Sequence, residues 1–255
     1  MTVIFMYHDV IDTRQGPKSG FYGAGAEIYK VRSSQFREHI QGLAGAFPGQ
    51  RPGLQTGAPF ALTFDDGGAS GVDVVADILA ERGWHAHFFV VTGLIGMPGF
   101  VSASGLRVLA AQGHTIGTHT VTHPRRLQAL ARAQIQREWH DSRARLADIL
   151  GTSIACGSVP GGYASRAVRR TAAEAGLTLL LTSEPTTRCY RDGGLTVMGR
   201  FAVRTVDGTE AVVAVTRRAL IRGTKALRWR ALGVAKNALG PVYPPLREGW
   251  LRLRA

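Results

Sequence analysis

Short apolar runs alternate along this chain with longer segments in which apolar and polar residues recur at helical spacing. The short runs, which predict buried strands, span residues 3–7, 60–64, 85–91, 114–117, 154–159, 177–182 and 197–203. The longer segments, several of them closed by a glycine, predict helices over residues 33–46, 71–82, 104–112, 126–150 and 165–175. This alternation predicts an α/β fold with a mostly parallel sheet.

Residues suited to catalysis or binding follow the predicted strands. They are His8, Asp65, Asp66, His119, Gly161 and Glu184. In α/β barrels the active site lies at the carboxyl ends of the strands, where such residues meet. We therefore expect them to gather at one edge of the sheet, with residues 15–27 as a mobile loop over the site.

Two short stretches carry the strongest chemical signal. Asp65 and Asp66 stand where a buried run stops at a glycine pair. His119 and His123 are four residues apart, a spacing that places two imidazoles on one face of a helix or turn. Either stretch alone has an ordinary explanation, an Asp-Gly turn or a pair of packed histidines.

Together, the two stretches offer the donors of a metal site. One carboxylate and two histidines leave coordination positions open for water and substrate, and a second carboxylate can take a proton from that water. Non-haem iron oxygenases share this ligand set, but they have no need of a base beside it. The pattern therefore favours a metal-dependent hydrolase.

Six stretches resemble motifs of the polysaccharide deacetylase family, carbohydrate esterase family four, which has the chitooligosaccharide deacetylase homology domain. They cover residues 6–10, 62–67, 113–124, 159–163, 181–185 and 199–201. The stretches around Asp65 and His119 follow the family pattern closely, and the resemblance extends over most of the chain. It implies a distorted (β/α)7 barrel, which we assign to residues 1–215, with residues 216–255 as a basic C-terminal extension.

The resemblance also implies a role for each residue of the site. Asp66, His119 and His123 would hold a divalent metal ion, and zinc is the usual occupant of such sites. Asp65 would act as general base. The backbone N–H of Gly161 would donate to the oxyanion of the tetrahedral intermediate.

The residue that supports the base departs from the family pattern. Relatives often carry Arg-x-Pro-aromatic at the third motif, whereas this chain reads Ser158-Val159-Pro160-Gly161. Arg166 or Arg200 is expected to replace the missing arginine. Arg200 is the better candidate, because relatives often carry an arginine in that strand. The alternative for either residue is a surface charge.

The proton donor departs from the pattern as well. Many relatives use a late histidine as general acid, but no histidine follows His140 here. One branch of the family instead carries Tyr-His-Asp near its start, which Tyr7-His8-Asp9 matches. We therefore predict His8 as general acid, with Asp9 as its orienting partner.

Positive charge is concentrated near the C-terminus. The formal net charge is +13, and residues 217–255 contain ten Lys or Arg against one acid, Glu248. Residues 216–239 combine this charge with apolar residues and Trp229. That pattern is typical either of a basic amphipathic helix on an anionic membrane or of a helix packed on the barrel with a solvated basic face. Only the charge supports nucleic acid, which is therefore not expected as a partner.

Other features bear on location. The N-terminus has no secretory signal pattern, and no stretch approaches the ~20 apolar residues that span a bilayer. Cys156 and Cys189 lack metal-binding spacing and are expected to be free thiols. We predict a cytoplasmic protein, peripheral on the inner face of the membrane if the C-terminal segment binds lipid. The sequence indicates no oligomeric state.

The expected reaction is removal of an acetyl group from an N-acetylated sugar. The expected substrate is a glycan or a lipid-linked intermediate of surface polysaccharide synthesis. Two alternatives stay open: a metal-dependent amidase acting on a non-glycan C–N bond, and a weakly active sugar-binding or membrane-associated protein. The complete ligand set and Asp65 argue against the last of these.

Overall fold

A curled, mostly parallel sheet forms the centre of the molecule. The computed structural model describes residues 1–11, 19–55 and 57–239, with side chains described as far as residue 233. The sheet has nine strands in the order β11-β1-β4-β5-β6-β7-β8-β10-β9. Their bounds are β1 Val3–Tyr7, β4 Phe60–Phe64, β5 His87–Val90, β6 Thr115–Thr118, β7 Cys156–Ser158, β8 Leu179–Leu181, β9 Cys189–Asp192, β10 Leu195–Met198 and β11 Phe201–Ala202. Neighbouring strands are parallel except for β9 and β10.

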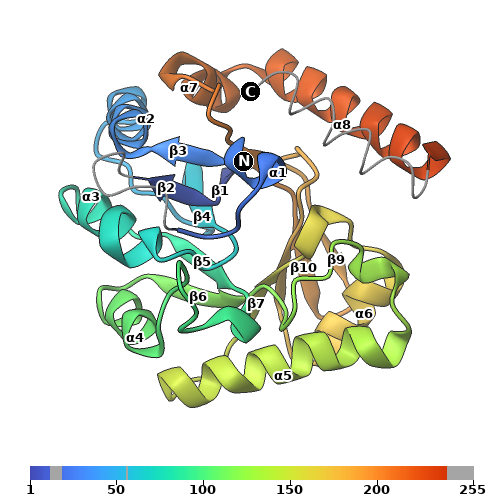
Figure 1. Cartoon of the computed structure of the whole chain (residues 1–255). Helices are drawn as coiled ribbons and strands as arrows, with labels where there is room; N and C mark the ends of the chain where they lie inside the picture. Colours follow the sequence, from blue (N-terminus) through green and yellow to red (C-terminus); the bar gives the residue numbers. More distant parts are fainter. Residues whose placement is uncertain (12–18, 56, 240–255) are drawn as a thin grey trace.

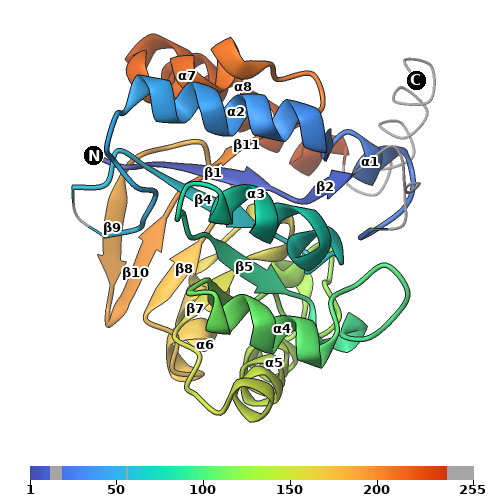
Figure 2. The same ribbon diagram turned by 90° about the vertical axis from the view of Figure 1, so that its left-hand side faces the viewer.

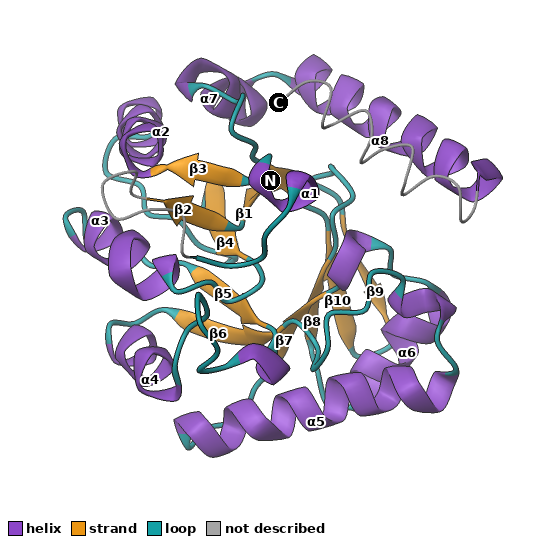
Figure 3. Ribbon diagram, in the orientation of Figure 1, coloured by secondary structure: helices purple, strands orange, loops and turns teal. Residues whose placement is uncertain are grey.

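Helices surround the sheet on its outer side (Figures 1 and 3). They are α2 Ser33–Ala46, α3 Ala76–Ala80, α4 Ala103–Ala111, α5 Arg132–Leu150, α6 Arg166–Glu174, α7 Thr209–Arg217 and α8 Ala219–Leu239. Figure 2 shows α7 lying beside α2 over the first strands, and these two helices pack together. No helix in the described ranges combines the length and apolar character that crossing a membrane requires.

The core explains why the first strands form where they do. Every residue of β1 and β4 is buried, as expected for strands of a parallel sheet that is covered on both faces. The ring of Tyr7 stacks on Phe64 and meets Phe36 of α2 edge-on, at centroid distances of 5.4 and 5.2 Å. Burial of each large apolar side chain of this kind stabilises the fold by about 1.5–3 kcal/mol.

The α/β fold predicted from the sequence is confirmed, and the barrel is distorted to the point of being open. Strands β11 and β9 stand at the two edges of the sheet and do not pair with each other. Because the strands are parallel, the carboxyl ends of β1, β4, β5, β6, β7, β8 and β10 share one edge. This edge carries the residues predicted to form the site.

One strand prediction was wrong in a way that matters for the site. Residues 197–203 form two strands, with β10 pairing with β8 and β11 pairing with β1. The chain breaks between them because Gly199 lies against the carbonyl oxygen of Glu184, where a Cβ would collide with that oxygen. The backbone N–H of Arg200 then donates to the same oxygen at 2.9 Å. Arg200 therefore lies between β10, which is near one edge of the sheet, and β11, which forms the other edge.

Other boundaries differ because short elements have little periodicity. The helix predicted from residue 126 begins at Arg132, after a 3₁₀ turn over Leu127–Ala129. The three-residue strands β2 Asp9–Ile11 and β3 Lys30–Arg32 pair with each other outside the main sheet and were not predicted. Residues 24–27 form a short helix, α1 Ala24–Glu27, within the predicted loop 15–27. Part of that loop, residues 12–18, lies outside the described residues.

Candidate metal centre

The two aspartates leave strand β4 through an unusual backbone turn. Asp65 continues the strand, since its N–H donates to the carbonyl of Tyr7 at 3.0 Å. Asp66 has φ 74°, a left-handed conformation that few residues other than glycine adopt. Adjacent residues of a strand normally face opposite sides. The turn at Asp66 therefore allows both carboxylates to face one site, and Gly67, at φ 78°, continues it.

The two histidines lie on a strained loop after β6. The N–H of His119 donates to the carbonyl of Val90 at 2.9 Å, which extends the β5–β6 pairing. Thr120 and His123 both have positive φ, 69° and 54°. Such strain persists only where surrounding contacts hold it, and it clusters at functional sites. The chain fold thereby brings the imidazole rings of His119 and His123 to a centroid distance of 4.9 Å.

A glutamate on helix α5 holds this loop in place. Glu138 accepts hydrogen bonds from the backbone N–H groups of Val121 and Thr122, at 2.8 and 3.0 Å, and from the Thr122 hydroxyl at 2.6 Å. The role of Glu138 could not be predicted from the sequence, because nothing near it in the chain marks a partner 16 residues away. It fixes the backbone between the two histidines.

Asp66, His119 and His123 converge. Oδ1 of Asp66 lies 3.5 Å from Nε2 of His119 and 3.4 Å from Nε2 of His123. One potential ligand atom from each of the three residues falls within 4.8 Å of the others. The structure thus places together the three residues that the sequence predicted as ligands.

Two observations show that these residues fit a divalent ion. Oδ1 of Asp66 is buried without a hydrogen-bond partner among the described residues. Nδ1 of His119 lies 2.8 Å from the carbonyl oxygen of Ser158, which can only accept, so Nδ1 carries the proton and Nε2 presents its lone pair. Metal-binding histidines are oriented in this way by a second partner.

The electrostatics of the three residues also favour a cation. Burial, and next the charge of Asp65, raise the pKa of Asp66 well above its ordinary value. Burial is also the main cause that lowers the pKa of His119, to about 3. His119 is therefore neutral, the form that binds metals, and at Asp66 burial outweighs the opposing effect of the Arg200 charge.

Asp65 is held by Arg200, which lies between β10 and β11. Nη1 and Nη2 of Arg200 donate to Oδ1 and Oδ2 of Asp65, both at 2.7 Å. Both side chains are buried. Burial alone would raise the pKa of Asp65, but Arg200 and then His119 lower it below the ordinary range. Asp65 is therefore an ionised, fixed carboxylate beside the three clustered residues.

Ser158 completes this contact. It stands at the position where the family resemblance leads one to expect arginine, and its hydroxyl lies 2.6 Å from Nη2 of Arg200 and 3.1 Å from Oδ2 of Asp65. Its hydroxyl therefore contacts both members of the buried pair. Arg166, the other arginine considered, is exposed at the start of α6. Of these two arginines, Arg200 is the one that contacts Asp65.

His8 lies at the same edge, just after β1. Its Nδ1 is buried without a hydrogen-bond partner among the described residues, and its ring packs on Tyr29 at a centroid distance of 4.6 Å. Burial lowers the pKa of His8 to about 4, although the charge of Asp65 acts in the opposite sense. His8 is therefore neutral near pH 7.

The prediction that Asp9 orients His8 was wrong. Oδ1 of Asp9 accepts hydrogen bonds from the hydroxyls of Ser19 and Ser70, at 2.6 and 3.1 Å. Asp9 follows His8 in an extended segment, so the two side chains point to opposite sides. Asp9 instead anchors the segment at Ser19, close to Phe21, whose ring lies 5.0 Å from that of His123.

Gly161 lies in the 3₁₀ turn Pro160–Gly162, which follows β7. Its φ of 67° is left-handed, and a Cβ there would come within 2.8 Å of the carbonyl oxygen of Arg125. Glycine is therefore required at this position. The turn belongs to the carboxyl edge of the sheet, the same edge as the metal centre.

Comparisons with known proteins agree with this arrangement. Residues 55–180 match the family model described as polysaccharide deacetylase. Over 129 residues the chain is 37% identical to a chitooligosaccharide deacetylase of Sinorhizobium fredii, an alignment that covers 49% of this chain and 58% of the relative. The chain spans 58% of this curated relative and 4% of another.

Solved structures show the same fold. A deacetylase of Streptococcus pyogenes, PplD, in complex with acetate, superimposes with a TM-score of 0.68 at 20% identity, covering 84% of this chain and 97% of that one. IcaB of Ammonifex degensii superimposes with a TM-score of 0.70 at 21% identity, covering 85% and 97%. At these identities the likeness establishes the curled α/β fold.

Proposed function

Because this chain belongs to the polysaccharide deacetylase family, we propose that it is a metal-dependent hydrolase that removes the acetyl group from an N-acetylated sugar. One observation carries the proposal. Three clustered residues that fit a divalent ion lie beside a separate carboxylate, Asp65, which Arg200 keeps ionised. Amide hydrolysis needs both parts, an electrophilic centre and a base.

Asp66, His119 and His123 would hold the ion, and zinc suits their nitrogen and oxygen donors. When bound, the ion supplies Lewis acidity toward the acetyl carbonyl and makes a nearby water easier to deprotonate. Asp65 would accept the proton of the attacking water. An ionised carboxylate has about four lone-pair sites, and the hydrogen bonds of Asp65 with Arg200 and Ser158 occupy one on Oδ1 and two on Oδ2. One on Oδ1 stays available for water.

Two further groups would act on the substrate. The backbone N–H of Gly161 would donate to the oxyanion that forms on the acetyl carbonyl. His8 would donate a proton to the departing amine. Because its low pKa keeps His8 neutral before the reaction, we propose that Asp65 passes to His8 the proton that it takes from the attacking water. His8 then transfers this proton to the amine as the C–N bond breaks, and Asp65 is ionised again.

We further propose a lipid-linked N-acetylated sugar as the substrate, at the cytoplasmic face of a membrane. The support comes from helix α8, where the side chains of Leu220 and Leu227 are 85% and 71% exposed. The exposed Arg217 and Arg218 precede them. Apolar side chains beside cations are typical of surfaces that bind anionic lipid.

Acetate release tests the proposed activity. Zinc-loaded protein should release acetate from an N-acetylglucosamine oligomer, lose this activity when the metal is chelated, and regain it when zinc is returned. His119→Gln should be inactive under all three conditions. Activity that survives chelation would contradict a metal-dependent mechanism.

Co-sedimentation with vesicles tests the membrane contact. Wild-type protein should sediment with anionic phospholipid vesicles, and Leu220→Asp with Leu227→Asp should not. Equal sedimentation of both proteins would contradict a role for this face of α8.

A further inference from the structure

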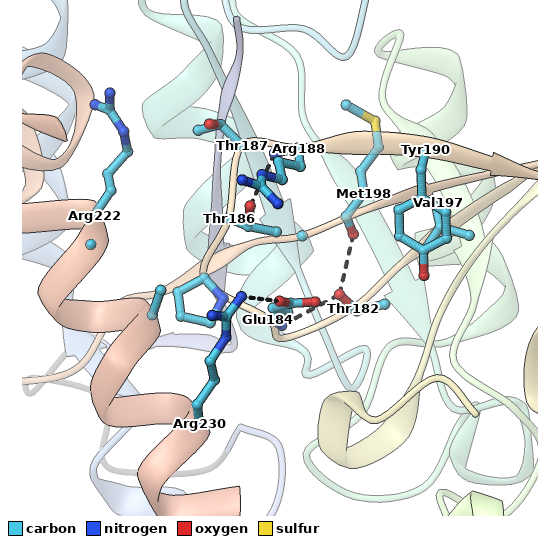
Figure 4. Close-up of a pocket in the computed structure, with 14 residues that line it drawn as sticks. Thr182, Glu184, Thr186, Thr187, Arg188, Tyr190, Val197, Met198, Arg222 and Arg230 are labelled. Carbon is cyan, nitrogen blue, oxygen red and sulfur yellow. Dashed lines mark hydrogen bonds and ion pairs between the residues drawn. The ribbon is translucent and has the colours of Figure 1, made fainter. Parts of the chain in front are cut away.

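A hollow of about 370 Å³ lies between helix α8 and the segment that links β8 to β10 (Figure 4). Glu184, Arg188 and Tyr190 line it from that segment, and Arg222 and Arg230 line it from α8. None of the three proposed metal ligands is among its lining residues. The hollow is therefore distinct from the metal centre.

Arg200 connects the hollow with the metal centre. Its Nε donates to the carbonyl of Thr182 at 3.1 Å, and its backbone N–H donates to the carbonyl of Glu184 at 2.9 Å. Both of these residues line the hollow. The other end of Arg200 holds Asp65. Arg200 thus contacts both the backbone of two residues that line the hollow and the proposed base, at the carboxyl edge of the sheet.

Helix α8 is fixed in place as one wall of this hollow. Trp229 stacks on Tyr163, which follows β7, at a centroid distance of 5.0 Å. Nη1 of Arg222 donates to the carbonyl oxygens of Val215 and Thr216 in α7, at 2.9 and 3.1 Å. The helix is therefore held at both the adjoining helix and the edge of the sheet.

The charged groups that face the hollow are rich in hydrogen-bond donors. The guanidinium of Arg188 makes no hydrogen bond with any described residue, and Arg230 has only an ion pair with Glu184 at 3.8 Å. In Figure 4, Arg188 and Arg230 reach toward the space from opposite walls, whereas Arg222 extends away from it. Each guanidinium has five N–H donors and no acceptor. Two such groups against one carboxylate suit an anion.

We propose that this hollow binds a phosphate group of the substrate while the acetylated sugar occupies the metal centre. Arginine binds phosphate through paired, charge-assisted hydrogen bonds, and Arg188 and Arg230 would supply them. A neutral sugar would leave the Arg188 guanidinium without an anionic partner and Arg230 with Glu184 alone. The inference rests on the proposed deacetylase function and narrows its substrate to a phosphorylated N-acetyl sugar.

Kinetics with two soluble substrates tests the proposal. For N-acetylglucosamine 1-phosphate, Arg188→Gln and Arg230→Gln should each raise KM about tenfold, the loss that corresponds to one charge-assisted hydrogen bond. For the neutral methyl glycoside of N-acetylglucosamine, KM should stay within about twofold of the wild type. Equal effects on both substrates, or no effect on either, would overturn the proposal.

Arg228→Gln is the matched control. Arg228 is exposed on the same helix, two residues from Arg230, and does not line the hollow. The Arg228→Gln variant removes the same charge as Arg230→Gln, but outside the hollow. Its KM for the phosphorylated sugar should therefore match that of the wild type. A rise equal to that of Arg230→Gln would reveal general attraction by the helix and would overturn a defined phosphate site.

Two more measurements distinguish the proposed phosphate site from loss of the deacetylase activity and from binding to membrane lipid. Calorimetric titration with inorganic pyrophosphate should show binding that Arg188→Gln and Arg230→Gln weaken and Arg228→Gln retains, whether or not acetate is released. This distinguishes failure of the phosphate site from failure of the proposed activity. If the two variants lose only binding to anionic vesicles and keep their KM for the soluble phosphorylated sugar, the phosphate comes from membrane lipid, and the proposal is overturned.

Discussion

At the scale of single residues, the buried pair of Arg200 and Asp65 links stability with the proposed catalysis. A carboxylate in this position would be protonated by burial if it had no cationic partner. Arg200 provides that partner through two hydrogen bonds of 2.7 Å. The contact that keeps Asp65 ionised, as its proposed role as base requires, therefore also stabilises the folded state.

Replacing Arg200 with methionine should destabilise the protein by about 3–5 kcal/mol, the usual cost of leaving one charge of a buried pair without its partner. Urea unfolding measures the loss. The double variant Arg200→Met with Asp65→Asn has no buried charge at this position, so it should recover part of the stability. A double variant less stable than Arg200→Met would show that the unpaired charge is not the cause.

A buried histidine should make stability fall in mild acid. Burial, and next His85, lower the pKa of His114 to about 4, and its Nδ1 accepts a hydrogen bond from the N–H of Ala86 at 3.2 Å. The unfolded chain, with a histidine pKa of about 6.5, takes up the proton first. This stability is therefore complete above about pH 6.5 and is lost as the pH falls toward 4.

His114→Asn tests this, because the Oδ1 of asparagine can accept the same hydrogen bond without titrating. The free energy of unfolding, compared at about pH 7 and pH 5, should fall less in the variant than in the wild type. The same fall in both proteins would rule out His114 as the source.

The cluster of Asp66, His119 and His123 could be predicted from the sequence because the three residues lie in two short stretches that follow apolar runs. Their supporting residues could not be predicted in the same way. Ser158 reaches Asp65 from a strand 93 residues later in the chain, and Glu138 reaches the histidine loop from a helix. Neither has a local pattern that marks its partner.

At the scale of elements, helix α5 positions the loop between the two histidines of the proposed metal centre. Glu138→Gln should weaken zinc affinity about tenfold, because residues that orient metal ligands typically contribute 10–100-fold. Competition with a chelator of known affinity measures this. Glu174→Gln removes a glutamate of α6 that pairs with Arg132, and it should bind zinc as the wild type does. Unchanged affinity in Glu138→Gln would contradict this role of α5.

The break between β10 and β11 shows what periodicity cannot reveal about an element. The run 197–203 is apolar enough for one strand, and it was predicted as one. The close approach of Gly199 to Glu184 divides it, since that contact depends on the loop after β8. The same break directs Arg200 to Asp65, so the feature missed by the prediction is one that builds the site.

At the scale of the whole molecule, the alternation of strands and helices was sufficient to predict an α/β fold. It did not predict that the sheet stays open, because nothing in the pattern of single strands tells which edges will pair. The position of α8 also came only from the structure. Its stacking contact with Tyr163 depends on the turn after β7, far from α8 in the sequence.

Removing the Trp229 ring should loosen α8 from the rest of the molecule. Trp229→Ala should be cleaved within α8 by trypsin several-fold faster than the wild type, because the stacked ring is the aromatic contact between this helix and the loop after β7. Leu227→Ala is the control, since Leu227 is 71% exposed and its loss should leave the cleavage rate unchanged. Equal rates for Trp229→Ala and the wild type would contradict docking of α8 through this contact.

The most direct test is to measure acetate release and bound zinc on the same samples of wild type and Asp65→Asn. We predict about one zinc ion per chain in both proteins, with acetate release lower in Asp65→Asn by about 10²–10⁴-fold, the usual contribution of a general base. If both proteins bind zinc and release acetate at the same rate, the proposed role of Asp65 is contradicted. Absence of zinc from the wild type after loading would contradict the metal centre itself.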